Sequence, residues 1–218
     1  FSMITRHYME LFGASREDFG RICISQRDNA IAASRSLFNK PLSMDDYIDA
    51  RVIAEPLHLF DCVMPCAGAE GFLMMSVDRA KSLGLPFAKI LASEELYNAY
   101  PEDDIHFRGG WQIFSEDLYS AAGLGPEDIN LLQTYDDYPV IVMLQLEDLG
   151  FCKKGEAADF IRNTSLNWNG DGLPHNTCGG QLSAGQAGAA GGFIGLVESI
   201  KQLTRTGLKN AVSEANIA

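Results

Sequence analysis

The sequence contains no hydrophobic run long enough to cross a lipid bilayer. Its longest apolar stretches, residues 139–144 and 185–196, fall short of the roughly 20 residues that a membrane helix needs, and the second is rich in glycine. We therefore expect a soluble protein without a membrane segment. Hydrophobic residues nevertheless make up 46% of the chain, which is enough to build a sizeable buried core.

Basic residues are scarce. The chain has 17 Lys and Arg against 29 Asp and Glu, which gives a formal net charge of −12. The densest basic spot is Lys153-Lys154, and Glu156 follows it closely. Because such a chain repels the phosphates of nucleic acid and anionic membrane surfaces, we expect neither as a partner.

The cysteines do not form the pattern of a disulfide framework. There are five of them, an odd number for 218 residues, so a reducing cytoplasm is the expected location. Cys178 is interpreted as a small buried thiol rather than a reactive one. The spacing of His, Cys and Asp residues matches no metal site, so no metal is expected.

Helical patterns dominate the start of the chain, and an alternation of helices and strands follows. Helices are predicted over 2–12 and 15–34, with a short one from Ser43, and Phe72 to Met75 form the best strand core before residue 77. Beyond it we predict helices at 77–83, 112–123, 138–149 and 186–206 and strands at 87–93 and 129–134. This alternation predicts an α/β fold, a mixed or parallel sheet covered by helices, with a boundary near Ser76.

Glycine and alanine are concentrated in one segment, residues 179–192. Small residues at this density allow the backbone to approach a ligand or another element closely, and the segment from Phe193 to Leu203 has helical periodicity. Two interpretations remain open. A ligand could lie against free N–H groups at the helix start, or the segment could be a tight packing joint without a ligand.

Three regions of the chain resemble the thiolase superfamily, in particular thiolases of the sterol-carrier-protein-X type. Residues 175–192 resemble the stretch Asn-Gly-Gly-x-x-x-x-Gly-His-Pro-x-Gly-x-Ser-Gly. Residues 128–138 resemble the strand leading to the Asn-Glu-Ala-Phe motif, which becomes His-Asp-Cys-Phe or Tyr-Asp-x-Phe in that subfamily. The third region comprises residues 8–13, 27–32 and 56–62, so the resemblance covers nearly the whole chain in order.

The resemblance implies a layered α/β/α thiolase fold and a piece of a longer polypeptide. Residues 1–76 would be the end of the N-terminal half, and residues 77–218 a C-terminal domain that stops before its final strands. The implied activity is acyl-CoA carbon–carbon chemistry, with coenzyme A as part of the substrate and no separate cofactor. The family also implies a homodimer and a small OB-fold partner protein.

The expected catalytic residues are Tyr135, His175 and Gln186. Tyr135 stands at a polar pocket position and could act as acid or base. Gln186 stands where the family has its histidine, and an amide cannot accept a proton, although it can donate a hydrogen bond to an oxyanion. His175 could point into the pocket or serve as a hydrogen-bonded structural residue. The expected substrate-binding residues are Gly179, Gly180, Ser183, Gly185 and Tyr138.

Three functions remain open on these grounds. Both thiolase cysteines are expected outside this sequence, and Gln186 replaces the histidine, so retro-aldol cleavage tolerates the change better than acyl transfer does. A non-catalytic thiolase-like subunit that binds acyl-CoA or holds a complex together is the alternative. An unrelated α/β binding module would require the three ordered matches to be coincidental.

Overall fold

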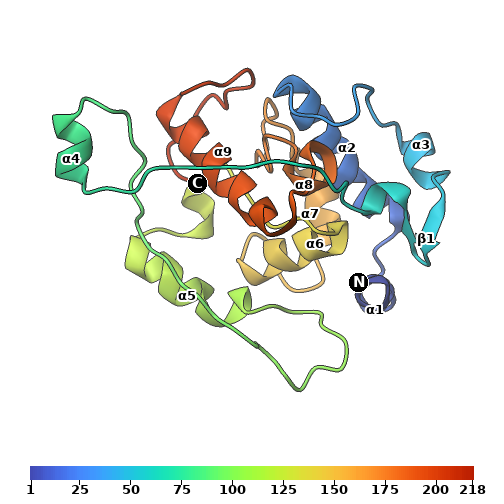
Figure 1. The fold of residues 1–218 in the computed structure, drawn as a ribbon. Helices are drawn as coiled ribbons and strands as arrows, with labels where there is room; N and C mark the ends of the chain where they lie inside the picture. Colours follow the sequence, from blue (N-terminus) through green and yellow to red (C-terminus); the bar gives the residue numbers. More distant parts are fainter.

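A computed structural model describes all 218 residues, and most of its regular structure is helical (Figure 1). The N-terminal part contains α1 (Ser2–Phe12), α2 (Arg16–Ala32), α3 (Met44–Ile48), the short strands β1 (Val52–Ala54) and β2 (Leu57–His58), and the 3-10 turn η1 (Leu59–Asp61). The remainder contains α4 (Val77–Ser82), α5 (Trp111–Ala122), η2 (Pro126–Asp128), α6 (Pro139–Asp148), α7 (Ala157–Asn163), α8 (Gly180–Ala184), η3 (Gly188–Gly192) and α9 (Phe193–Thr204).

Local sequence signals account for several helix ends. Ser15 and Asp18 form a capping box at the start of α2, in which the Ser15 backbone N–H donates to the Asp18 carboxylate at 2.8 Å. Pro139 occupies the first turn of α6, where a missing N–H costs nothing. Gly13 ends α1 and Gly123 ends α5, both in the left-handed conformation that glycine adopts without strain. These helices therefore begin and end close to the predicted residues.

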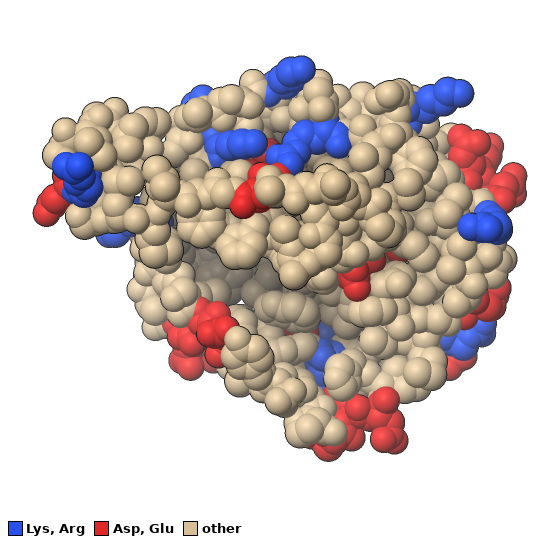
Figure 2. All heavy atoms as spheres, viewed as in Figure 1, with Lys and Arg blue, Asp and Glu red and all other residues tan.

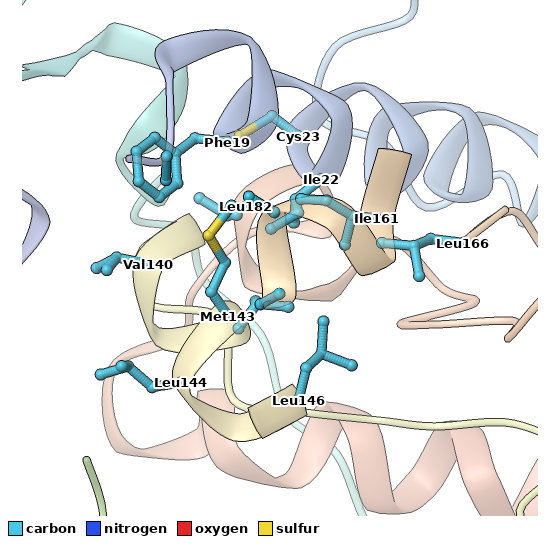
Figure 3. Close-up of a cluster of buried hydrophobic side chains, with 14 of the residues drawn as sticks. Phe19, Ile22, Cys23, Val140, Met143, Leu144, Leu146, Ile161, Leu166 and Leu182 are labelled. Carbon is cyan, nitrogen blue, oxygen red and sulfur yellow. The ribbon is translucent and has the colours of Figure 1, made fainter. Parts of the chain in front are cut away.

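The main hydrophobic core joins the N-terminal helices to α6, α7 and α8 (Figure 3). Helix α2 lies at its centre and packs against α3, α6, α7 and α8. Its fully or nearly fully buried members include Phe19, Ile22, Val140, Met143, Leu146 and Leu182. The segments on both sides of residue 76 thus share one core, and the predicted division into residues 1–76 and 77–218 stays a prediction.

The prediction of a mixed or parallel sheet covered by helices is wrong for this structure. The only sheet is the antiparallel pair β1–β2, and two isolated parallel bridges join Pro65 to Gln186 and Leu132 to His175. No strand forms over 72–75 or 87–93, and the segment 129–134 contributes only the bridge at Leu132. A strand is stable only when a neighbour satisfies its backbone groups, and residues 72–75 and 87–93 have no such neighbour. Their apolar side chains remain exposed, Leu73 by 83%.

Helix α9 also differs from the prediction for 186–206. The glycine-rich residues 188–192 form the 3-10 turn η3, and the α-helix begins at Phe193. Its buried face consists of Ile194, Val197, Glu198 and Gln202, whereas Leu196 is 43% exposed. Residues spaced by three and four share a helix face, and Leu196 lies outside the face that Ile194 and Val197 define.

An irregular segment between η1 and α4 runs across α9 (Figure 1). Its Phe72 ring packs on Phe193, with ring centroids 5.9 Å apart. Figure 2 shows that this face of the molecule is hollowed between the crossing segment and α5. None of the helices combines the length and the apolar character that a membrane crossing requires.

Candidate functional site

The backbone of Tyr135 is held from two sides. The preceding residues run alongside 174–176, where the Leu132 N–H donates to the Pro174 carbonyl at 2.9 Å. On the other side, the Gln145 side chain from α6 pairs with both backbone groups of Tyr135, as a neighbouring strand would. Its Oε1 accepts from the Tyr135 N–H at 3.1 Å and its Nε2 donates to the Tyr135 carbonyl at 2.6 Å. The main chain is thereby fixed while the Tyr135 side chain stays 43% exposed.

The Gln186 side chain meets three other side chains of the site. Its Nε2 lies 3.0 Å from Asp137 Oδ1, 3.0 Å from Gln181 Oε1 and 3.4 Å from Tyr135 Oη. The backbone of Gln186 is fixed between residues 64 and 66, because its N–H donates to the Met64 carbonyl at 2.8 Å and its carbonyl accepts from the Cys66 N–H at 2.9 Å. Tyr135, Asp137, Gln181 and Gln186 therefore form one polar cluster, called the tyrosine–amide cluster below.

Asp136 lies directly beneath this cluster and anchors α8. Its buried carboxylate accepts the backbone N–H groups of Gln181 at 2.9 Å and Leu182 at 3.1 Å, and the Gln26 amide at 3.0 Å. Burial raises the pKa of Asp136 to about 6, against the opposing effect of these hydrogen bonds. Asp136 thus caps α8.

Four residues of the glycine-rich segment were predicted to bind substrate. At two of them, Gly179 and Gly180, close packing explains why the residue is glycine. A Cβ on Gly179 would come within 2.3 Å of the Ala30 Cβ, and one on Gly180 within 2.1 Å of Asp136 Oδ2. Both glycines also have positive φ angles, 99° and 58°. Their close approach is made to protein atoms, so their role in substrate binding stays a prediction.

The other three predicted substrate-binding residues, Ser183, Gly185 and Tyr138, also lie against protein atoms or are buried. A Cβ on Gly185 would lie 2.7 Å from Cys66 Sγ. The Ser183 side chain is buried. The Tyr138 ring stacks on Phe1 with centroids 4.2 Å apart. Contact of these three residues with a substrate likewise remains a prediction.

His175 is completely buried and reaches the cluster only indirectly. Its Nε2 lies 2.7 Å from Thr134 Oγ1, and its Nδ1 has no hydrogen-bond partner. Burial lowers the pKa of His175 to about 3, so the imidazole is neutral at physiological pH. This geometry agrees with the hydrogen-bonded structural interpretation of His175, although Thr134 links it to the cavity beside Tyr135.

A cavity of about 310 Å³ opens next to the tyrosine–amide cluster. It is bounded by the segment that ends at Tyr135, by the α8 side chain Gln181, by the end of η3 and by the first turns of α9. The lining residues are Leu132, Gln133, Thr134, Tyr135, Gln181, Gly191, Gly192, Ile194, Gly195, Leu196, Ser199 and Ala218. The glycines on this wall leave the space that side chains would otherwise fill.

Sequence reasoning does not identify Asp137 and Gln181 as site residues. Asp137 lies two residues after Tyr135, and side chains at that spacing in an extended segment point to the same side, which is the signal that could have identified it. Gln181 has no comparable signal, because its position depends on the turn by which α8 returns to Gln186.

Comparison with known proteins places these features in a family. Residues 96–218 match the family model described as thiolase C-terminal domain-like. The chain is 34% identical, over 99% of its length, to a steroid side-chain-cleaving aldolase of Thermomonospora curvata, of which it covers 56%. It is 35% identical, over 94% of its length, to a 17-hydroxy-3-oxo-4-pregnene-20-carboxyl-CoA lyase of Mycobacterium tuberculosis, of which it covers 54%.

A solved structure agrees with these matches. The chain superposes over its full length on the Ltp2-ChsH2(DUF35) aldolase, with a TM-score of 0.82, 30% identity and 57% of that chain covered. The chain thus spans about half the length of the curated relatives that it matches.

Proposed function

The chain belongs to the thiolase superfamily, and from this premise we propose that the full-length protein cleaves a carbon–carbon bond of a β-hydroxyacyl-CoA by a retro-aldol reaction. One observation carries the proposal. The hydroxyl of Tyr135, the carboxylate of Asp137 and the amide of Gln186 meet at the edge of a cavity, so proton-exchanging and hydrogen-bonding groups are available there without a thiol.

The reaction needs a proton acceptor, a proton donor and a hydrogen bond to the developing oxyanion. A base takes the proton of the β-hydroxyl, the Cα–Cβ bond breaks, the β-carbon becomes a carbonyl, and the electron pair passes into the thioester as an enolate. A proton then returns to Cα and gives the shorter acyl-CoA. We assign the proton transfers to Tyr135 and Asp137, and the oxyanion hydrogen bond to the Gln186 amide, whose hydrogen directed at Asp137 would turn to the oxyanion when substrate binds.

Two features favour this reaction over acyl transfer. Gln186 occupies the histidine position of the thiolase pattern, and its amide cannot take the proton of a thiol. Two of the relatives described above are themselves named an aldolase and a lyase. His175 is too deeply buried to contact substrate, so we assign it a supporting role through Thr134.

A non-catalytic acyl-CoA-binding subunit is the second candidate function. The observation that favours it is the same replacement at Gln186, because loss of a catalytic histidine is also what a subunit that only binds its ligand would show. In both cases the glycine-rich segment and Tyr138 would contact the acyl-CoA. The two functions differ in whether substrate is converted.

We further propose that the protein is a cytoplasmic homodimer that works with a second protein. The superposed Ltp2-ChsH2(DUF35) aldolase carries a DUF35 component in its name, and the small OB-fold partner expected from the family would take that role here. Residues 1–76 would then complete an N-terminal thiolase half, with 77–218 as the C-terminal domain.

The experiment is a comparison of Tyr135→Phe with the natural protein, each full length and supplied with its partner. We expect the variant to lower the release of shortened acyl-CoA, measured by mass spectrometry, by about 100-fold or more, because proton transfer by a placed side chain contributes on that scale. Tyr119→Phe is the matched control, since the Tyr119 hydroxyl donates to the Leu149 carbonyl at 3.0 Å and borders neither the cluster nor the cavity.

The outcomes separate the candidates. If both folded variants cleave the substrate as the natural protein does, the assignment of Tyr135 is wrong. If no β-hydroxyacyl-CoA is cleaved by the natural protein but acyl-CoA binds, the non-catalytic function stands instead.

A further inference from the structure

We infer that Gln181 is a positioning residue, which orients the Gln186 amide and through it the Tyr135–Asp137 pair. The inference rests on the proposed function, because it assigns Gln181 a role in that same site. Gln181 does not belong to the sequence motif that contains Tyr135, and it is the second residue of the short helix α8.

The Asp136 carboxylate sets the orientation of the Gln181 amide. The residue is completely buried, its backbone N–H donates to Asp136 Oδ1 at 2.9 Å, and its Nε2 faces the same oxygen at 3.5 Å. A carboxylate oxygen attracts the amide nitrogen and repels the amide oxygen, so the Nε2 faces Asp136. The Oε1 of Gln181 is consequently turned away from Asp136 and toward Gln186.

The orientation of the Gln186 amide follows from that of Gln181. Its Nε2 lies 3.0 Å from Gln181 Oε1 and 3.0 Å from Asp137 Oδ1, and both oxygens can only accept. An amide nitrogen has two hydrogens, so these two contacts together fix its plane and exclude the flipped rotamer. Tyr135 Oη at 3.4 Å is the third neighbour of this nitrogen. Without Gln181, one of the two short contacts that hold the amide would be lost.

The wall behind Gln181 is shaped to admit its side chain. A Cβ on Gly191 would approach Gln181 Oε1 to 2.2 Å and Gln186 Cγ to 3.2 Å. The absence of a side chain at position 191 therefore leaves the space in which the two amides meet. Gln181 and Gly191 both border the 310 Å³ cavity. The contact between the two amides therefore belongs to the wall of the cavity in which the proposed substrate would bind.

The test is a double-mutant cycle of Gln181→Met and Gln186→Met in the full-length protein with its partner. Methionine keeps the approximate size of glutamine and removes the amide. We expect Gln181→Met to lower kcat about tenfold with KM nearly unchanged, and to have almost no further effect once Gln186 is Met, because residues that act through one another are non-additive. Gln202→Met is the control: this buried glutamine binds Thr177 and Glu198, and its effect should simply multiply with that of Gln186→Met.

A crystal structure of Gln181→Met gives a readout that does not depend on turnover. We expect the Gln186 amide to leave the position between Asp137 and Tyr135 that it holds in the natural protein. Should Gln181→Met fail to fold, Gln181→Asn withdraws the carbonyl by one methylene and enters the same comparisons.

Failure of the inference and failure of the proposed function give different results. If Tyr135→Phe abolishes turnover while the effects of Gln181→Met and Gln186→Met multiply, Gln181 is only structural. An unmoved Gln186 amide in the variant structure also overturns the inference, whatever the activity. If Tyr135→Phe leaves turnover unchanged, the proposed function fails, and the crystal structure alone then decides whether Gln181 orients Gln186.

Discussion

At the scale of single residues, burial decides how His175 behaves. The imidazole has no exposed surface, its Nδ1 lacks a partner, and its pKa is lowered from 6.5 to about 3 by burial. In an unfolded chain the same side chain takes up a proton near pH 6.5. Folding therefore excludes a proton from His175 throughout the range between these two values.

This exclusion predicts how stability depends on pH. The contribution of His175 to the free energy of unfolding is fully present above pH 6.5 and is lost as the pH falls, since the unfolded state then binds the extra proton. We expect the natural protein to lose about 2 kcal/mol more than His175→Gln between pH 7 and pH 5 in urea titrations. Equal losses of unfolding free energy in the two proteins would contradict the lowered pKa of His175 in the folded state.

Asp136 has the opposite effect on the pH dependence of stability, which is why the natural protein is compared with His175→Gln. Its pKa is raised from 3.8 to about 6, so the folded state binds a proton more readily and stability from this group falls as the pH rises through that range. Because Asp136 is present in both proteins, its contribution cancels in the comparison.

The residues of the site could be predicted from sequence only where a motif fixed them. Tyr135 and Gln186 come from two stretches far apart in the chain, and the structure brings their side chains within 3.4 Å. Their meeting with Asp137 and Gln181 depends on the direction in which a short loop turns, and residue types do not encode that direction. The burial of His175 was equally inaccessible, since a histidine near a glycine-rich loop is compatible with both the core and the pocket.

At the scale of elements, α8 exists because glycine is present where it begins. Gly180 has a φ angle of 58°, and the Asp136 carboxylate that caps the helix leaves no room for a Cβ. Helical periodicity could not reveal α8, because five residues are too few to show a period. The longer helices, in contrast, were predictable from local signals such as the capping box of α2 and the proline in the first turn of α6.

Gly180→Ala and Gly192→Ala should therefore differ sharply in stability. We expect the first to lower the free energy of unfolding by about 2–4 kcal/mol, because it combines a positive φ with a steric clash on a buried carboxylate. Gly192 has a φ of −63° with nothing within 4 Å of a Cβ, so alanine there should be neutral or stabilise by up to about 1 kcal/mol. Chemical denaturation of the two variants measures the difference, and similar values for both would refute this account of α8.

At the scale of the whole molecule, the strands were the part that sequence could not place. Residues 72–75 and 87–93 have the apolar composition of buried strands, and the structure leaves them unpaired with exposed side chains such as Leu73 and Ile90. Composition indicates that a segment is able to form a strand, but a strand forms only when a second strand pairs with it. The family assignment did not depend on these segments, because the motifs that carried it lie on the other elements.

The anchoring of α8 by Asp136 has a consequence for the order of folding. The hydrogen bonds that hold α8 join Asp136 to residues 45 and 46 positions later, and the bond from Gln26 spans 110 positions, whereas those within α6 close over four. Long loops close more slowly than local turns because more chain entropy is lost before the contact forms. In pulsed hydrogen exchange during refolding, the Leu182 amide should become protected after the amides of α6, and simultaneous protection would contradict this order. A chain released from an unfolded state would thus acquire its helices before it acquires a usable site, and catalytic competence would mark the end of folding.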